Sequence, residues 1–97
     1  MAAPNSKVPL FLPGRIMMTP GALVALATAN IPPEFLLFRH MTGDWGDLVK
    51  EDKLENDRAL GNGTRIFSSY LLPTGEKIWL ITEADRSTTT FLLPMEY

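Results

Sequence analysis

The last third of the chain limits the fold most, because three strand-like segments follow one another with only short connections. The segments are 64–72 (TRIFSSYLL), 76–82 (EKIWLIT) and 87–93 (STTTFLL). They are rich in isoleucine, threonine and aromatic residues, which strands favour. A Pro-Thr-Gly turn and the four residues 83–86 connect them. Connections this short require antiparallel pairing, so the sequence predicts a three-stranded antiparallel meander.

The middle segment carries apolar side chains on both of its faces. In an extended strand Ile78 and Leu80 point to one side, and Trp79 and Ile81 point to the other. This pattern is typical of a strand whose sheet is covered on both faces. We expect helices to cover one face and a partner molecule to cover the other.

The residues before the meander predict one short strand and three helices. The strand is expected at 15–18. Thr19 is suited to cap the first helix and a proline follows it, so this helix is expected over 20–29. The second helix should run from residue 33 to about residue 41, with apolar side chains nearly all round its axis. The third is polar and should begin near Asp47 and end before Gly61.

The predicted class is therefore α+β: a short N-terminal strand, three helices and a three-stranded antiparallel meander, with the option of one four-stranded sheet. Residues 14–97 form a single domain in this interpretation, since 97 residues suffice for one domain and one modest core. Residues 1–13 are interpreted as an extended N-terminal arm that Pro9 and Pro13 interrupt.

The composition excludes several classes of protein. There is no cysteine, which excludes disulfide scaffolds, thiolate metal sites and cysteine nucleophiles. This suits a reducing compartment, and we expect a cytoplasmic protein. No apolar run approaches the roughly 20 residues of a membrane span, and the N-terminus does not resemble a signal peptide. We expect no cofactor and no metal.

The charge is distributed unevenly along the chain. The formal net charge is −2, and most of the acidic side chains fall between residues 44 and 57. No basic stripe is present for a phosphate backbone to follow, which disfavours nucleic acid as a partner. The acidic segment 44–57 could instead attract a basic protein.

A first candidate site surrounds the single histidine. His40 and Asp44 are four residues apart, and an aspartate can orient an imidazole that acts as a general base. With Asp47 the same histidine could hold a divalent ion. The structural alternative is that an aspartate caps the third helix, Trp45 packs in the core, and His40 ends the second helix. We favour this alternative, because no nucleophile or further ligand is evident.

A second candidate site is the charged interruption Glu83-Ala84-Asp85-Arg86. Arg86 could bind a carboxylate or phosphate of a ligand through two parallel hydrogen bonds. The structural alternative is a hairpin turn in which Asp85 caps nearby N–H groups and Arg86 pairs with Glu83 or with an acid of a helix. Taken together, the candidate polar cluster comprises His40, Asp44, Trp45, Glu83, Asp85 and Arg86.

Three stretches, HMTGDWGDL, EDKLENDRAL and IWLITEADRSTTTFLLPMEY, together resemble a family of small uncharacterised proteins carried on plasmids, integrative elements and other bacterial mobile DNA. The resemblance covers residues 14–97, and its long C-terminal match is the specific part. It implies an accessory gene of bacterial mobile DNA, with no established activity. It also implies that the GDWG and EADRS segments meet in space.

The function expected from these observations is a non-enzymatic interaction module that forms a homodimer. The candidate interface is apolar and comprises Phe35, Leu37, Phe38 and Trp79. One alternative is an enzyme or small-ligand-binding protein that uses the candidate polar cluster. A second alternative is a nucleic-acid-binding protein that uses a groove between two subunits.

Overall fold

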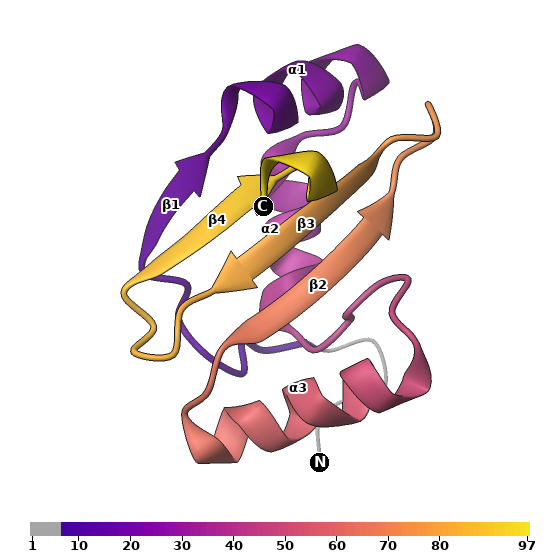
Figure 1. Cartoon of the computed structure of the whole chain (residues 1–97). Coiled ribbons are helices and arrows are strands. Elements are labelled where there is room, and N and C mark those ends of the chain that lie inside the picture. Colours follow the sequence, from indigo (N-terminus) through magenta and orange to yellow (C-terminus); the bar gives the residue numbers. More distant parts are fainter. Residues whose placement is uncertain (1–6) are drawn as a thin grey trace.

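The computed structural model describes residues 7–97 of the chain. Its elements are β1 (Arg15–Met18), α1 (Pro20–Ala29), α2 (Pro33–Met41), α3 (Lys50–Asn62), β2 (Ile66–Leu71), β3 (Lys77–Thr82), β4 (Thr88–Leu92) and a short 3-10 helix η1 (Pro94–Glu96). This order confirms the predicted α+β class, and Figure 1 shows the arrangement of the elements in space.

The four strands form one sheet in the order β1-β4-β3-β2. β2, β3 and β4 are the predicted antiparallel meander, and β1 joins it beside β4. The β1–β4 pair is parallel. This direction is possible because the chain between the two strands contains three helices and a hairpin, which is ample length for a crossover. The sheet therefore has two edges, β1 and β2.

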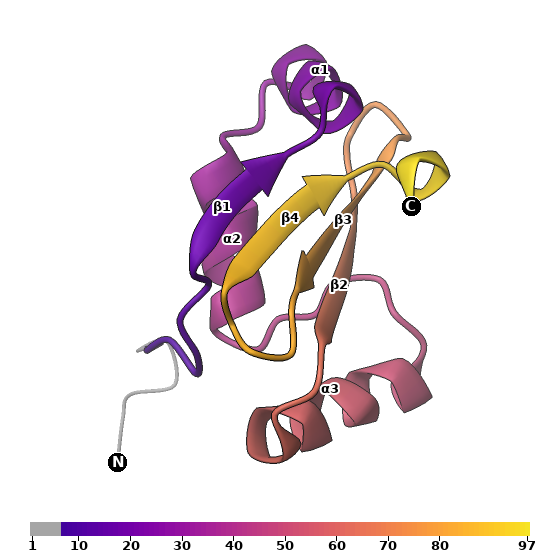
Figure 2. The ribbon, with the colours of Figure 1, turned by 60° about the vertical axis from the view of Figure 1, so that its left-hand side comes forward.

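The helices α1 and α2 lie on one face of the sheet (Figures 1 and 2). The main core forms between these helices and the strands, and its largest members are Leu26, Leu36, Tyr70, Ile78, Leu80 and Phe91. Because side chains alternate along a strand, Phe67, Trp79 and Ile81 point to the opposite face. Among the described residues, η1 and Tyr97 are what lies on that face, so one face is covered by helices and the other is largely open.

The first helix begins and ends as the sequence predicts. The Thr19 hydroxyl accepts a hydrogen bond from the Ala22 N–H at 3.2 Å, and Asn30 closes the helix with a left-handed φ of 58°. The Thr19 hydroxyl also donates to the Glu96 carboxylate at 2.5 Å, and this carboxylate accepts from the Gly21 N–H as well. Glu96 therefore ties η1 to the start of α1, and these bonds lower the pKa of its carboxyl group.

The third helix differs from its predicted bounds at both ends. It begins at Lys50, because Asp47 is used by the sheet: its N–H donates to the Ser69 carbonyl at 2.6 Å and its carboxylate accepts from the Leu71 N–H at 2.8 Å. It continues through Gly61 to Asn62, and Gly63, with a φ of 69°, caps it.

Part of the predicted N-terminal arm packs on the domain, while residues 1–6 lie outside the described residues. The Leu10 N–H donates to the Met41 carbonyl at 2.8 Å, and the Pro13 carbonyl accepts from the Thr89 hydroxyl at 2.8 Å. Between them, the Phe11 ring meets the His40 ring edge-on, with the ring centres 5.3 Å apart.

No single helix within residues 7–97 has the length and hydropathy to cross a membrane. α1 and α2 pass such a test only as a pair, and they are bent by 106° relative to each other. Both contribute buried side chains to the core of the domain.

Candidate functional site

His40 lies fully buried beneath the sheet and bonds to hydroxyl groups on both sides of its ring. Nδ1 is 2.6 Å from the Ser68 hydroxyl, and Nε2 is 2.8 Å from the Thr82 hydroxyl. The chain of hydrogen bonds continues from Thr82 to the Thr89 hydroxyl at 2.6 Å, and from there to the Pro13 carbonyl. His40 thus joins α2, β2, β3, β4 and the segment before β1 through one buried polar network.

The surroundings of His40 keep its ring neutral. Burial lowers the pKa of His40 from 6.5 to about 3. The rings of Phe11 and Trp45 enclose it edge-on, with centre distances of 5.3 and 6.1 Å. A general base needs access to substrate and a pKa near neutrality, and His40 has neither. Its geometry is that of a structural histidine.

Asp44 pairs with Arg39 at the end of α2. Arg39 Nε lies 2.7 Å from the Asp44 carboxylate, and its guanidinium stacks 4.6 Å from the centre of the Tyr70 ring. The Tyr70 hydroxyl in turn donates to the Asp44 carbonyl at 2.6 Å. The hydrogen bond from Arg39 lowers the pKa of Asp44, whereas burial raises the pKa of Tyr70. Asp44 therefore stabilises the turn after α2.

The segment after Asp44 runs along the outer edge of β2. The Ser69 N–H donates to the Trp45 carbonyl at 3.2 Å, and the Ser69 carbonyl accepts from Asp47. The Asp47 carboxylate accepts from the Leu71 N–H. Gly46 lies between these bonds, in an isolated bridge to Ser69 with a φ of 78°.

Asn56 completes the same edge from α3. Its side-chain amide donates to the Phe67 carbonyl at 2.5 Å, and its oxygen accepts from the Phe67 N–H at 3.1 Å. The outward-facing backbone groups of β2 are thus paired from Phe67 through Ser69 to the Leu71 N–H. The edge of β2 is closed to pairing with another strand.

Trp45 supports this arrangement from a small second core. It is buried together with Ala59 and Ile66, and Phe11 packs against the same group. Its indole N–H donates to the Asp57 carboxylate at 3.1 Å. Trp45 therefore anchors α3 to the loop that covers the edge of β2.

Arg86 binds the end of α3. Its guanidinium donates to the Thr64 carbonyl at 2.6 Å and to the Ala59 carbonyl at 2.9 Å, with longer bonds to the carbonyls of Glu83 and Ala84. The Ala59 carbonyl also accepts from the Gly63 N–H, and a cation beside the last turn of a helix is favoured by the helix dipole. Arg86 therefore connects the β3–β4 turn to α3.

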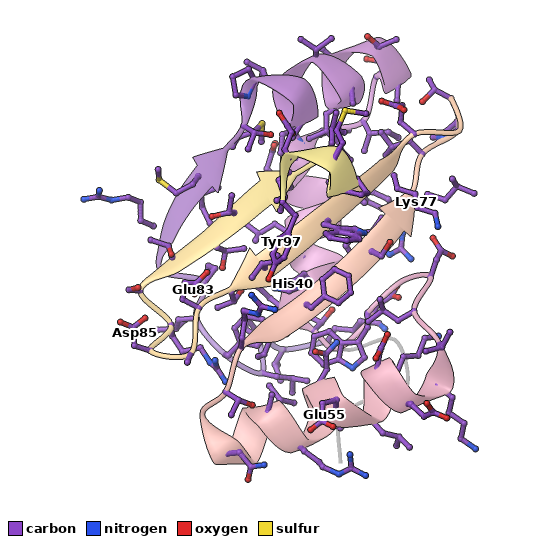
Figure 3. The ribbon with its side chains drawn as sticks, viewed as in Figure 1. His40, Glu55, Lys77, Glu83, Asp85 and Tyr97 are labelled. Carbon is purple, nitrogen blue, oxygen red and sulfur yellow. The ribbon has the colours of Figure 1, made fainter. Side chains whose placement is uncertain are left out.

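The other two acids of the turn have separate roles. The Asp85 carboxylate accepts from the Ser87 N–H at 2.9 Å, as in a capped turn. Hydrogen bonding from the side chain and then the N–H of Ser87 lowers the pKa of Asp85. Glu83 continues the ladder, with its N–H donating to the Thr88 carbonyl. Figure 3 shows Glu83 and Asp85 at the β3–β4 end of the sheet.

Replacement of Arg86 tests this structural role. We expect Arg86→Ala to lower the free energy of unfolding by about 2 kcal/mol, because the carbonyl groups of Ala59 and Thr64 lose a charged donor. Arg86 has a φ of 61°, so Arg86→Gly should lose about 1 kcal/mol less by relieving the backbone. Urea unfolding measures both variants. An Arg86→Ala variant within about 0.5 kcal/mol of wild type would show instead that the guanidinium is free for a ligand.

The two motifs approach each other through Phe11 rather than by a direct ion pair. The Phe11 ring lies 5.3 Å from the His40 ring and 5.8 Å from the Arg86 guanidinium carbon, measured to the ring centres. Asp44 and Arg86 each bind a different partner. The candidate polar cluster is therefore not one site. Asp44 holds a turn, His40 is buried, and Arg86 binds the end of α3.

The acidic segment 44–57 contains both bonded and exposed side chains. Asp44, Asp47 and Asp57 of the acidic segment hold the folded loop, and Glu51 and Asp52 are exposed in the first turn of α3. A basic partner for residues 44–57 stays a prediction. Within residues 7–97 no group of three histidine or acidic side chains is arranged to hold a metal ion.

The predicted dimer interface falls on two faces of the molecule. Phe35 and Phe38 are 56% and 51% exposed on α2, and Leu37 packs against the main core. Trp79 lies on the opposite, open face of the sheet, where it meets the Phe67 ring at 4.9 Å. One flat interface cannot contain both Phe38 and Trp79.

Comparison with known proteins adds no family assignment: no family model matches the chain, and neither a curated protein nor a solved structure matches it.

Proposed function

We propose that the protein is a non-enzymatic interaction module that forms a homodimer, and that the two subunits pair through the β1 edge of the sheet. The open edge of β1 supports this proposal most strongly. In support of a non-enzymatic role, the side chains of His40, Asp44, Trp45, Asp85 and Arg86 are engaged in structural hydrogen bonds. No buried side-chain nitrogen or oxygen in the described part of the chain lacks a hydrogen-bond partner.

The backbone of β1 alternates between the sheet and the solvent. The Arg15 N–H donates to the carbonyl of Ser87, just before β4, at 2.9 Å, and the Thr19 N–H donates to the Phe91 carbonyl of β4 at 3.0 Å. Because this direction alternates along a strand, Ile16 and Met18 turn their N–H and C=O groups away from the sheet. Ile16 and Met17 are 42% and 45% exposed. β1 is therefore an apolar edge strand whose outward backbone groups have no partner among residues 7–97.

The two edge strands of the sheet differ in whether their outward backbone groups are hydrogen-bonded. Asn56, Asp47 and the Trp45 carbonyl occupy the β2 edge, whereas nothing within residues 7–97 pairs with the outer side of β1. Proteins usually protect an edge with a charge, a proline or a covering loop. β1 is an open apolar strand at the edge of the sheet opposite the protected β2, and this favours pairing between strands at β1.

A second copy of β1 fits this edge. With a two-fold axis at Met17, Ile16 of one subunit lies opposite Met18 of the partner subunit, and each such pair exchanges two backbone hydrogen bonds. Arg15 then lies opposite Thr19 of the partner subunit, so like charges do not oppose each other. The result is one continuous eight-stranded sheet across the dimer, built from two copies of the four-stranded sheet.

Analytical ultracentrifugation at increasing concentration tests this proposal. The mass should rise from 10.8 kDa towards twice that value in the micromolar range. Ile16→Pro removes an outward N–H from an edge strand, where proline is tolerated, so it should remain folded and monomeric. Val24→Lys, which removes an apolar side chain that is 64% exposed on α1, should still dimerise.

The outcomes separate the possible interfaces. A wild-type mass that stays at 10.8 kDa, or an Ile16→Pro variant that dimerises like wild type, contradicts pairing at β1. If Phe38→Lys is monomeric while Ile16→Pro still dimerises, the interface lies on α2. The resemblance to proteins of bacterial mobile DNA extends the proposal to a cytoplasmic accessory protein of such an element.

A further inference from the structure

The open face of the sheet contains a hollow with aromatic walls. Its volume is about 220 Å³, and it is lined by Arg65, Phe67, Trp79, Ile81 and Tyr97. Trp79 stands between two other rings, 4.9 Å from Phe67 and 5.8 Å from Tyr97, both edge-on. Tyr97 is 67% exposed and lies over the sheet in Figure 3.

A cation forms one wall of this hollow. The Arg65 guanidinium carbon lies 5.5 Å from the centre of the Tyr97 ring, and its Nη1 donates to the Tyr97 hydroxyl at 2.7 Å. No carboxylate pairs with Arg65 among the ion pairs of the described residues. The positive charge excludes a cationic ligand and leaves a neutral or anionic one.

Three cations and two acids belong to this face. Strand alternation and register place Arg15, Lys77 and Arg65 on it, together with Glu83. The second acid is Glu96 of η1, whose carboxylate accepts hydrogen bonds from Thr19 and Gly21. The acids of α3 lie at the end of the sheet (Figure 1). An anionic chain that enters the hollow would therefore meet Arg65, a cation without a paired carboxylate among the ion pairs of the described residues.

The size of the hollow limits what enters it. Pockets for drug-sized ligands usually exceed about 300 Å³, so this hollow suits a single planar ring system. Aromatic side chains on an open sheet, flanked by cations, are the arrangement on which unpaired bases stack. We infer that the open face binds single-stranded nucleic acid, with one base against Trp79 and Tyr97 and an adjacent phosphate near Arg65.

This inference is independent of the proposed dimer. The hollow is formed within one subunit by β2, β3 and the C-terminal residues. In a dimer paired at β1, the two open faces would join and present two hollows. Binding to the monomeric Ile16→Pro variant therefore separates failure of the base site from failure of the dimer.

Fluorescence anisotropy of a labelled oligothymidylate at low salt tests the site. The wild-type protein should bind the single strand, more weakly as salt rises, and should bind the matching duplex at least about fivefold less tightly. Tyr97→Ala and Arg65→Ala should each weaken binding at least about fivefold. Arg58→Ala removes an exposed arginine of α3 and should leave binding within about twofold.

Other results would overturn the site. They are an absence of binding to the oligonucleotide at low salt, an equal loss in Arg58→Ala and Arg65→Ala, or tighter binding of the duplex. Displacement of the oligonucleotide by an acidic peptide that contains phenylalanine, at a lower concentration than unlabelled oligothymidylate requires, would assign the hollow to a protein partner instead. Circular dichroism of each variant establishes that it is folded.

Discussion

Gly46→Ala is expected to lower the free energy of unfolding by about 3 kcal/mol. Gly46 has a φ of 78°, a conformation that costs an L-residue energy by itself. A Cβ at this position would also overlap the Ser69 carbonyl oxygen and approach Cδ1 of the Tyr70 ring to 2.7 Å. The loop would have to leave the edge of β2, and the bonds to Ser69 and Leu71 would be lost with it.

Gly61→Ala is the matched control. Gly61 lies inside α3, and a Cβ added there meets nothing within 4 Å. This variant should raise the free energy of unfolding by about 0.5–1 kcal/mol, because alanine favours the helix. Urea unfolding of both variants gives the comparison. Equal stabilities for Gly46→Ala and wild type would show that the loop does not depend on close contact with β2.

The second large effect is a loss of stability at mildly acidic pH. The unfolded chain binds a proton at His40 near pH 6.5, whereas the folded protein resists protonation until about pH 3. The unfolded state therefore binds more protons between these values, so stability is full above pH 6.5 and falls as the pH is lowered. At pH 5 the free energy of unfolding should be about 2 kcal/mol below its value at pH 7.5.

The single histidine makes this effect easy to isolate. His40→Gln keeps hydrogen-bonding groups between Ser68 and Thr82 but does not titrate, so its stability should change much less between pH 7.5 and pH 5. The lowered pKa values of Asp44, Asp85 and Glu96 act at lower pH, because stability from these groups is lost only as the pH falls from the ordinary carboxyl pKa of about 4 through the lowered folded-state values. An imidazole NMR signal that titrates near pH 6.5 in the folded protein would contradict a buried neutral His40.

The elements of the fold could be predicted because each has a local signal. The Thr19 cap, the prolines at 32 and 33 and the Pro-Thr-Gly turn at 73–75 mark where helices and strands change. The start of α3 could not be predicted, because Asp47 is a good helix cap in isolation and the strand edge of β2 competes for it. The structure resolves this competition in favour of the sheet.

The candidate site was harder to predict because its partners are distant in sequence. Ser68, Thr82 and Thr89 are ordinary strand residues by local pattern, yet they surround His40. Phe11 lies in a segment that appears too short and too interrupted to belong to the core. The register of a sheet decides such contacts, and a one-residue shift would reverse them.

The charged side chains of the open face could not be predicted from the sequence either. Arg15, Arg65 and Lys77 are spread over more than half of the chain, so they form no basic stripe in the sequence. Strand alternation and the register of the sheet place them on one face. The distribution of charge along the chain therefore could not reveal that these three cations share a face.

Amide hydrogen exchange of β1, followed by NMR at several protein concentrations, tests whether two copies of β1 pair. The Ile16 and Met18 amides are expected to gain protection as concentration rises, since they face the partner strand. The Arg15 amide already donates to Ser87 within one subunit and should change little. If the Ile16 and Met18 amides exchange at the same rate at every concentration, pairing at the β1 edge is contradicted. This holds whether the protein stays monomeric or forms a dimer through another surface.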